Sequence, residues 1–96
     1  SMTELRTLID EIDRVLVRTL ALRQSCIDRA IELKPSEGLP ARIEARVEDV
    51  VRKVRATAQA EGMAPELAEH LWRQLIDWSI AREEAVLGRD PEEDPA

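Results

Sequence analysis

The stretch TELRTLIDEIDRVLVRTLALRQSCIDRAIEL, residues 3–33, decides the fold of this chain. Its apolar residues recur at spacings of three and four, the pattern of an amphipathic helix; they include Leu5, Leu8, Ile9, Ile12, Val15, Leu16, Leu20, Ile27 and Ile31. Thr3 is the expected N-cap. Such a helix is ~45 Å long, whereas a compact domain of 96 residues has a radius of gyration of only ~12 Å. The helix is therefore predicted to extend beyond its own domain and to need another chain to cover it.

Two further helices are predicted after this one, and no segment shows the alternation of a β-strand. The loop 34–40 contains two prolines and a glycine, which are expected to end the first helix. The second helix is expected over Ala41–Ala60 and the third over Pro65–Leu87, and a glycine follows each of them. The sequence thus predicts an all-α chain, with one helical domain over residues 3–88 and a disordered acidic tail over residues 89–96.

Composition argues against several classes of function. The formal net charge is −6, but four of the acids lie in the tail, and no basic stripe with interleaved aromatics suggests nucleic-acid binding. No signal peptide or membrane-length apolar run is present, and Ser1-Met2 resembles a remnant of tag cleavage. Cys26 is the only cysteine, which fits a reducing cytoplasm, and its apolar face predicts a packed thiol. His70 has no second His or Cys at a metal-ligand spacing, so we expect a surface histidine and no metal.

Two cations interrupt the apolar face of the first helix. Arg23 and Lys34 are eleven residues apart, and at about 100° per residue this spacing returns to nearly the same face after three turns. Charges are rarely buried without a partner, and no acid lies three or four residues from Arg23. We therefore expect an anion between the two cations, and a bound ligand is a candidate for it.

Two polar residues share the apolar face of the third helix. Glu83 comes seven residues after Ile76, so the two side chains lie within about 20° of each other around the helix. Loss of hydration there favours a protonated carboxylic acid, which can donate a hydrogen bond. A salt bridge to an Arg of another helix is the structural alternative. Ser79 adds a hydroxyl one turn earlier, although a small packing residue is its commoner role.

Two more arginines are candidates for a binding site. Arg6 lies seventeen residues before Arg23, which is ~25 Å along a helix and far beyond the reach of one side chain. If Arg6 belongs to a site with Arg23, it therefore comes from a second subunit. Its alternative role is an exposed first-turn Arg near Asp10. Arg46 lies beside Val50 on the second helix, where it could face inward or belong to a solvated flank.

The joint spacing of these residues resembles the all-α class of chorismate mutase. The resemblance runs from about Leu5 to Leu87, and it rests on Leu5-Arg6, Ile9-Asp10-Glu11-Ile12-Asp13, Arg23, Lys34 with its proline loop, Arg46, and Ser79 four residues before Glu83. It implies an intertwined homodimer in which the two long first helices lie side by side. It also implies two equivalent active sites, each completed by an Arg of the partner, and no cofactor.

The activity implied by the resemblance is the [3,3]-sigmatropic rearrangement of chorismate, a small dicarboxylate, to prephenate. Such an enzyme holds the flexible substrate in its reactive chair-like shape and places donors where the ether oxygen gains negative charge. By resemblance, the catalytic residues are Lys34, Glu83 and Arg23. Lys34 would contact a carboxylate and the ether oxygen, to which a protonated Glu83 would donate.

The resemblance also implies how the substrate is bound. Arg23 and Arg6 of the partner subunit would hold the two carboxylates. Ser79 would assist at a carboxylate, and Arg46 would add positive field. Lys34 completes this implied substrate-binding set.

Two positions depart from the pattern of the family and leave the substrate open. Some members carry an acid directly after the second-helix Arg, where it binds the ring hydroxyl, and this chain has Val47 there. An Asp found earlier on that helix in some members is Ile43 here. Isochorismate-pyruvate lyases share the fold and the cations, and the stretch 78–81 resembles theirs. A lyase, a mutase acting on the 4-amino analogue of chorismate, and a non-enzymatic helical dimerisation module therefore stay open as alternatives.

Overall fold

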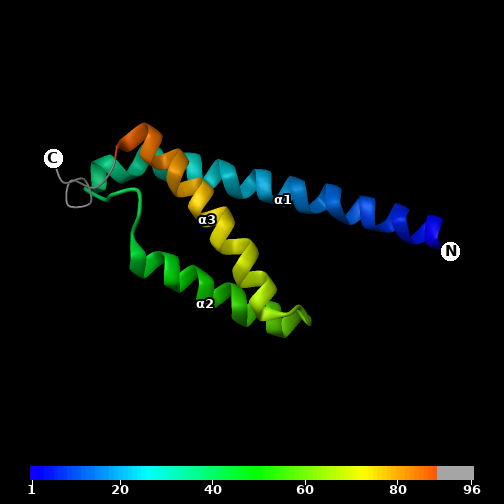
Figure 1. Ribbon diagram of the computed structural model, residues 1–96. Helices are drawn as coiled ribbons and strands as arrows, with labels where there is room; N and C mark the ends of the chain where they lie inside the picture. The colour runs from blue at the N-terminus through cyan, green and yellow to red at the C-terminus, as the bar shows by residue number, and fades with distance from the viewer. Residues whose placement is uncertain (89–96) are drawn as a thin grey trace. The chain divides into compact units, whose positions relative to one another are not determined.

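The fold of the chain is entirely helical over the part that the structure describes. Figure 1 shows this computed structural model, which describes residues 1–88. Its elements are α1 (Met2–Glu37), α2 (Glu44–Glu61) and α3 (Pro65–Leu87), with no β-strand within residues 1–88. The predicted all-α fold is confirmed. The acidic tail predicted over residues 89–96 lies outside the described residues.

The chain divides into two units. The first, Ser1–Ala30, is a single helical segment, and the second begins at Ile31 and holds the end of α1 together with α2 and α3. None of the residues 2–37 that form α1 is buried. Its exposed side chains form the apolar face that the sequence predicted to require another chain; they include Leu5, Leu8, Ile9, Ile12, Val15 and Leu16. Cys26 is exposed as well, so the prediction of a packed thiol is wrong for the single chain.

Both ends of α1 differ from the prediction. The helix begins before Thr3, so the prediction of Thr3 as N-cap is wrong. At the other end α1 continues for one more turn, through Pro35. Proline lacks the N–H of a helical residue, but here the helix closes soon after it, because Gly38 adopts a φ of 68° and the Leu39 N–H donates to the Lys34 carbonyl at 2.9 Å. Lys34 therefore lies in the last turn of the helix and not in a loop.

The boundaries of α2 and α3 follow the backbone preferences of a few residues. α2 begins three residues later than predicted, because Ile43 is extended (φ −124°, ψ 101°) and Ala41 stays in the connection. Gly62 ends α2 in the left-handed conformation (φ 79°), which glycine adopts without the cost of a Cβ clash. Pro65 opens α3, as predicted, since the first helical turn needs no N–H from it.

The hydrophobic core lies between α2 and α3, which run side by side (Figure 1). Both helices belong to the second unit, and the turn at Gly62 makes them antiparallel, so that the start of α2 neighbours the end of α3. The central cluster is apolar and consists of Val47, Val51, Ile76 and Ile80, with Val50 packed against it. Within residues 1–88, the members of this small core come from α2 and α3.

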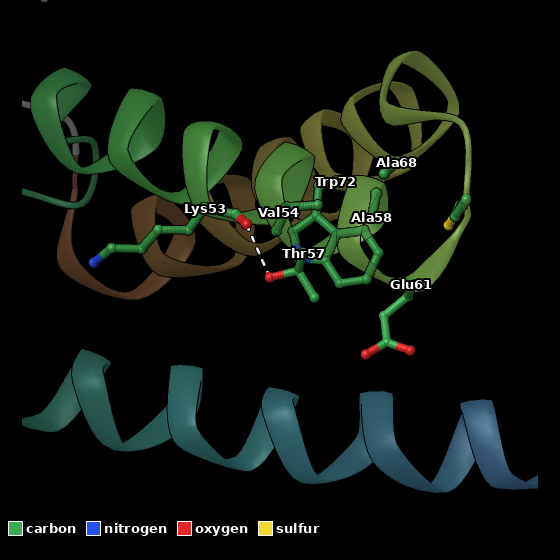
Figure 2. Close-up of a pocket in the computed structure, with 8 residues that line it drawn as sticks. Lys53, Val54, Thr57, Ala58, Glu61, Ala68 and Trp72 are labelled. Carbon is green, nitrogen blue, oxygen red and sulfur yellow. Dashed lines mark hydrogen bonds between the residues drawn. The ribbon is translucent and has the colours of Figure 1, made fainter.

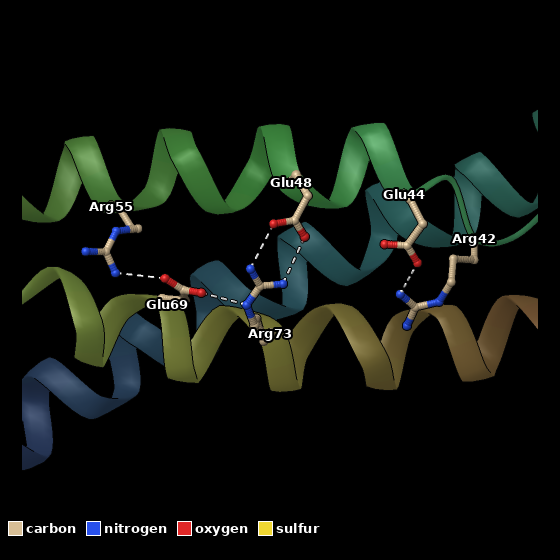
Figure 3. A network of polar contacts seen from close by, with 6 residues as sticks. All are labelled: Arg42, Glu44, Glu48, Arg55, Glu69 and Arg73. Carbon is tan, nitrogen blue, oxygen red and sulfur yellow. Dashed lines mark hydrogen bonds and ion pairs between the residues drawn. The ribbon is translucent and has the colours of Figure 1, made fainter.

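Ion pairs tie the polar edges of α2 and α3 together (Figure 3). Arg73 donates to Glu48 at 2.9 and 3.0 Å and to Glu69 at 2.7 Å, and Arg55 donates to Glu69 at 2.8 Å. The hydrogen bonds from Arg73 lower the pKa of both carboxyl groups. These groups are exposed to water, so each pair adds little stability and mainly fixes the register of the two helices.

Candidate active site

The ammonium of Lys34 meets the carboxylate of Glu83 between the end of α1 and the end of α3. Lys34 Nζ donates to Glu83 Oε2 at 2.6 Å and to the Ala41 carbonyl at 2.7 Å. Glu83 is 3% exposed, and 17% of the Lys34 side chain is exposed. The predicted burial of Glu83 is confirmed. Within this chain, the anion beside Lys34 is therefore Glu83. Of the two interpretations of Glu83, the ion pair with another helix is the one observed, and its cation is a Lys and not an Arg.

Three segments of the chain fix this ion pair. The extra turn of α1 keeps Lys34 within the helix, and Glu83 lies one turn before the end of α3. Ala41, 4% exposed, lies in the connection between α1 and α2 and turns its carbonyl toward the ammonium. No sequence pattern indicated the role of Ala41, because a backbone acceptor is not encoded by a side-chain type.

Glu83 belongs to a buried face of α3. Ser79, one helical turn earlier on α3, is buried on the same side, with 7% of its surface exposed. Ile76 and Ile80 are also buried on α3 near this turn. In such a site a charge interacts strongly with a partner and is costly without one. The structure thus pairs Lys34 with Glu83 and buries Ser79 one helical turn away on α3.

The three predicted arginines differ in their surroundings. The Arg46 side chain is 63% exposed and contacts Asp49 at 2.8 Å, which corresponds to the solvated-flank alternative. Arg6 and Arg23 belong to the first unit, where Arg6 is exposed and Arg23 is half-buried. Neither of these two forms an ion pair or hydrogen bond through its side chain within residues 1–88. Substrate binding by these arginines stays a prediction.

A hollow of about 260 Å³ opens between α2 and α3 near the Gly62 turn (Figure 2). Its walls are mainly apolar, and the indole of Trp72 lies across it. It is lined by Lys53, Val54, Thr57, Ala58, Glu61, Met63, Ala68 and Trp72. Because the two helices are antiparallel, the hollow lies at the opposite end of the pair from Glu83. It is therefore a separate feature from the polar group around Lys34.

Metal binding has no support in the described residues. Within residues 1–88, no group of three or more His, Cys, Asp or Glu side chains is arranged to hold a metal ion. His70 is exposed, as predicted, and its ring nitrogen lies 2.9 Å from the amide nitrogen of Gln74. Among the helices of the described chain, none combines the length and apolar character that crossing a membrane requires.

Comparison with known proteins identifies the family. The family of chorismate mutase type II matches residues 5–84, which is most of the described chain. A T-protein of Enterobacter agglomerans is 32% identical over 82 residues. That match covers 85% of this chain and 22% of the T-protein, so the chain spans only about a fifth of the length of this relative. Residues 5–84 include all six of the predicted site residues, and the chain belongs to the chorismate mutase type II family.

Proposed function

We propose that this chain is a chorismate mutase, which converts chorismate to prephenate by a [3,3]-sigmatropic rearrangement. The observation that carries the proposal is the Lys34 ammonium, which is held between Glu83 and the Ala41 carbonyl in a chain of this family. A dicarboxylate whose ether oxygen gains negative charge during the reaction needs a fixed cation in a site of low polarity. Lys34 meets that need, because two hydrogen bonds fix its side chain and little of it is exposed to water.

The reaction requires restraint and electrostatics and no covalent intermediate. The protein has to hold the substrate in its chair-like reactive conformation, which lowers the entropic part of the barrier. It also has to stabilise the ether oxygen more strongly in the transition state than in the ground state. An ammonium group has three N–H donors, and two of those of Lys34 are engaged by the protein. The third can donate to the substrate, and Glu83 can add a second donor when it is protonated.

The two substrate carboxylates need further cations. We assign them to Arg23 and to Arg6 of the partner subunit, since ~25 Å of helix separates the two positions in one chain. Ser79 assists at a carboxylate through its hydroxyl. Arg46 adds a positive electrostatic potential at the site, and to do so it would have to leave its ion pair with Asp49. No cofactor takes part in this proposal.

A second copy of the chain completes the protein in this proposal. The apolar face of α1 is exposed along its length, with Leu8 55%, Ile12 49% and Leu16 54% exposed. The hollow beside Trp72 is the complementary apolar surface on the second unit. We assign it to α1 of the partner subunit, because a helix with a continuous apolar stripe can fill an apolar hollow between two helices. The result is a symmetric homodimer with two shared sites.

Cleavage of isochorismate to salicylate and pyruvate is the second candidate. It is favoured by Val47, which is 7% exposed and packs in the cluster between α2 and α3, where an acid would bind a ring hydroxyl. A dimerisation module without activity is a third candidate, since the exposed face of α1 would serve it equally well. That candidate leaves the partly buried Lys34 and the buried Glu83 with a structural role alone.

An assay with chorismate and isochorismate side by side tests the proposal. Substrate loss would be followed and the products identified for both compounds under the same conditions. Prephenate from chorismate as the faster reaction is the expected result, and it would show that Val47 is compatible with the ring hydroxyl. Salicylate and pyruvate from isochorismate as the faster reaction would make the chain a lyase. Turnover of neither compound would overturn both enzymatic candidates.

A further inference from the structure

The ammonium of Lys34 depends on a backbone acceptor that lies outside the helices. The connection between α1 and α2, residues 38–43, carries the Ala41 carbonyl, to which Lys34 Nζ donates at 2.7 Å. Backbone hydrogen bonds close the two ends of this connection, at Leu39 and at Ile43. The Ala41 carbonyl lies between these ends. Its direction therefore depends on what holds the middle of the connection.

Arg42, the next residue, holds the middle of the connection through its guanidinium. Arg42 Nη1 donates to Glu44 Oε1 at 2.8 Å, as Figure 3 shows, and Nη2 donates to Asp77 Oδ1 at 2.8 Å. Glu44 is the first residue of α2, and Asp77 lies on α3. The Arg42 side chain is 29% exposed, whereas those of its two partners are 67% and 68% exposed. Arg42 therefore ties the connection to both helices of the core.

The contacts of Arg42 and Lys34 form a closed ring on α3. Asp77 binds Arg42. Glu83, six residues later on the same helix, binds Lys34. Lys34 also binds the carbonyl of Ala41, the residue that precedes Arg42 in the chain. The Ala41 carbonyl and the Arg42 N–H belong to one planar peptide unit, so holding Arg42 in place restricts rotation of that carbonyl.

We propose that Arg42 is a positioning residue for the rearrangement of chorismate, and that it acts on Lys34 through the Ala41 carbonyl. An ammonium has three N–H donors in a tetrahedral arrangement. Two of them are directed at Glu83 and at the Ala41 carbonyl, and together these acceptors fix the direction of the third, which donates to the substrate. Arg42 itself touches no substrate. This inference rests on the proposed function and adds a residue that the proposed function does not include.

Arg42 should affect the rate far more than the stability of the fold. Its two carboxylate partners are exposed, so loss of these ion pairs lowers the stability only slightly. A donor to the ether oxygen acts in the transition state, where a small displacement lowers the rate strongly. We expect Arg42→Ala to lower kcat for chorismate about tenfold and no further, because Glu83 still holds Lys34. KM should change little, because other residues are assigned to the substrate carboxylates.

Steady-state kinetics of the full chain with chorismate tests this role. Arg55→Ala is the matched control, because Arg55 also joins α2 to α3, through a 2.8 Å bond to Glu69. Its kcat should stay within about twofold of the native value. Circular dichroism and urea unfolding verify that each variant is folded.

Two further variants test whether Arg42 acts through its anchor on α3. Asp77→Asn removes the charge of that anchor with little change of shape, and it should reproduce most of the fall in kcat. It also keeps the test available should Arg42→Ala fold poorly. The double variant, Arg42→Ala with Asp77→Asn, should be no slower than Arg42→Ala alone, because the two side chains act as one unit.

The outcomes separate this inference from the proposed function. Native turnover of chorismate with an unchanged kcat in Arg42→Ala and Asp77→Asn would overturn the inference and leave the mutase intact. A rise in KM at constant kcat would also overturn it, because Arg42 would then act on substrate binding. An equal fall in kcat in Arg55→Ala would do the same, because the effect would not be specific to the connection. A native chain that does not turn over chorismate would refute the proposed function, and the role of Arg42 with it.

Discussion

The first unit, Ser1–Ala30, and the pair formed by α2 and α3 differ in how much of their apolar surface is buried. α2 and α3 turn Val47, Val51, Ile76 and Ile80 toward each other and close a core. α1 carries at least as many large apolar side chains but buries none of its residues 2–37. The polar groups follow the same division, because ion pairs link α2 to α3, whereas Arg6 and Arg23 make no such contact within residues 1–88.

This difference separates a unit that buries apolar side chains within the chain from one that leaves them exposed. In the part of the chain that the structure describes, every buried side-chain nitrogen or oxygen has a hydrogen-bond partner. The second unit therefore has what a stable helical pair requires. The first unit has an apolar stripe and unmatched cations, which are the features of a surface that is covered on association. In the proposed homodimer, the dependence on a second copy is thus concentrated in α1.

The largest expected effect comes from a charge on the apolar stripe of α1. In Ile12→Glu, burial of a carboxylate would replace burial of an apolar side chain worth about 1.5–3 kcal/mol, once per subunit. We expect the dimer to weaken by at least about a hundredfold and turnover to fall with it. Val17→Glu is the matched control, because Val17 is 66% exposed and lies outside the stripe. Sedimentation equilibrium gives the association constants, and equal dimers in both variants would contradict the role of the stripe.

The second largest effect is expected at the polar group of the second unit. Lys34→Ala leaves the buried Glu83 carboxylate without its cation, which costs about 3–5 kcal/mol in comparable buried pairs. Turnover should be lost while the dimer persists. Urea unfolding measures the stability, and the initial rate with chorismate measures the activity.

Two variants separate the structural from the chemical role of Lys34. Lys53→Ala removes an exposed lysine that is paired with Asp49, and its effect on stability should be far smaller than that of Lys34→Ala. Replacing both partners, as Lys34→Met with Glu83→Leu, should restore most of the stability, since no buried charge is left unpaired. The double variant should nevertheless be inactive. Turnover in the double variant would show that neither group is catalytic.

The smallest effect is expected from the exposed ion pairs on α2, and it appears on acidification. Hydrogen bonds from Lys53, Arg52 and Arg46 lower the pKa of Asp49 from 3.8 to about 2. A carboxyl whose pKa is lower in the folded state stabilises the fold above its unfolded pKa, and this contribution is lost as the pH falls through the folded value. The stability from Asp49 is therefore present above about pH 4 and disappears toward pH 2.

Urea unfolding as a function of pH tests this contribution. Asp49→Asn should flatten the dependence of stability on pH between about pH 4 and pH 2, where the native chain loses stability. Glu61→Gln is a control, since Glu61 makes no ion pair within residues 1–88. An unchanged slope in Asp49→Asn would mean that these hydrogen bonds do not persist in solution.

The sequence predicted the helices well and their ends less well. The periodicity of apolar residues was sufficient for the all-α fold, and Gly62 and Pro65 marked the break between α2 and α3. The predicted end of α1 was wrong, because Pro35 was expected to stop a helix that in fact closes at Gly38. Proline in a last turn costs less than in a helix interior, where more of the helix would lose its bonding pattern.

The candidate site was predictable only in part. The position of Glu83 on an apolar face indicated its burial, since helical periodicity is local information. Its pairing with Lys34 was not predictable, because it depends on the extra turn of α1 and on how that turn meets α3. No sequence pattern predicted that the Ala41 carbonyl would accept a hydrogen bond from Lys34. Helical periodicity indicates on which face of its helix a residue lies. Contacts between helices also depend on how the helices pack, which periodicity does not specify.

Mixing two inactive chains tests the central claim, that each active site is shared by two copies. Arg6→Ala and Lys34→Ala would each be inactive alone, but a heterodimer has one site in which both residues are intact. After subunit exchange of an equal mixture, half of the dimers are heterodimers, so about a quarter of the native activity should return. Subunit exchange is verified with differently labelled chains. Recovery of about a quarter of the activity is the predicted result, and no recovery despite complete exchange would contradict a site built from two chains.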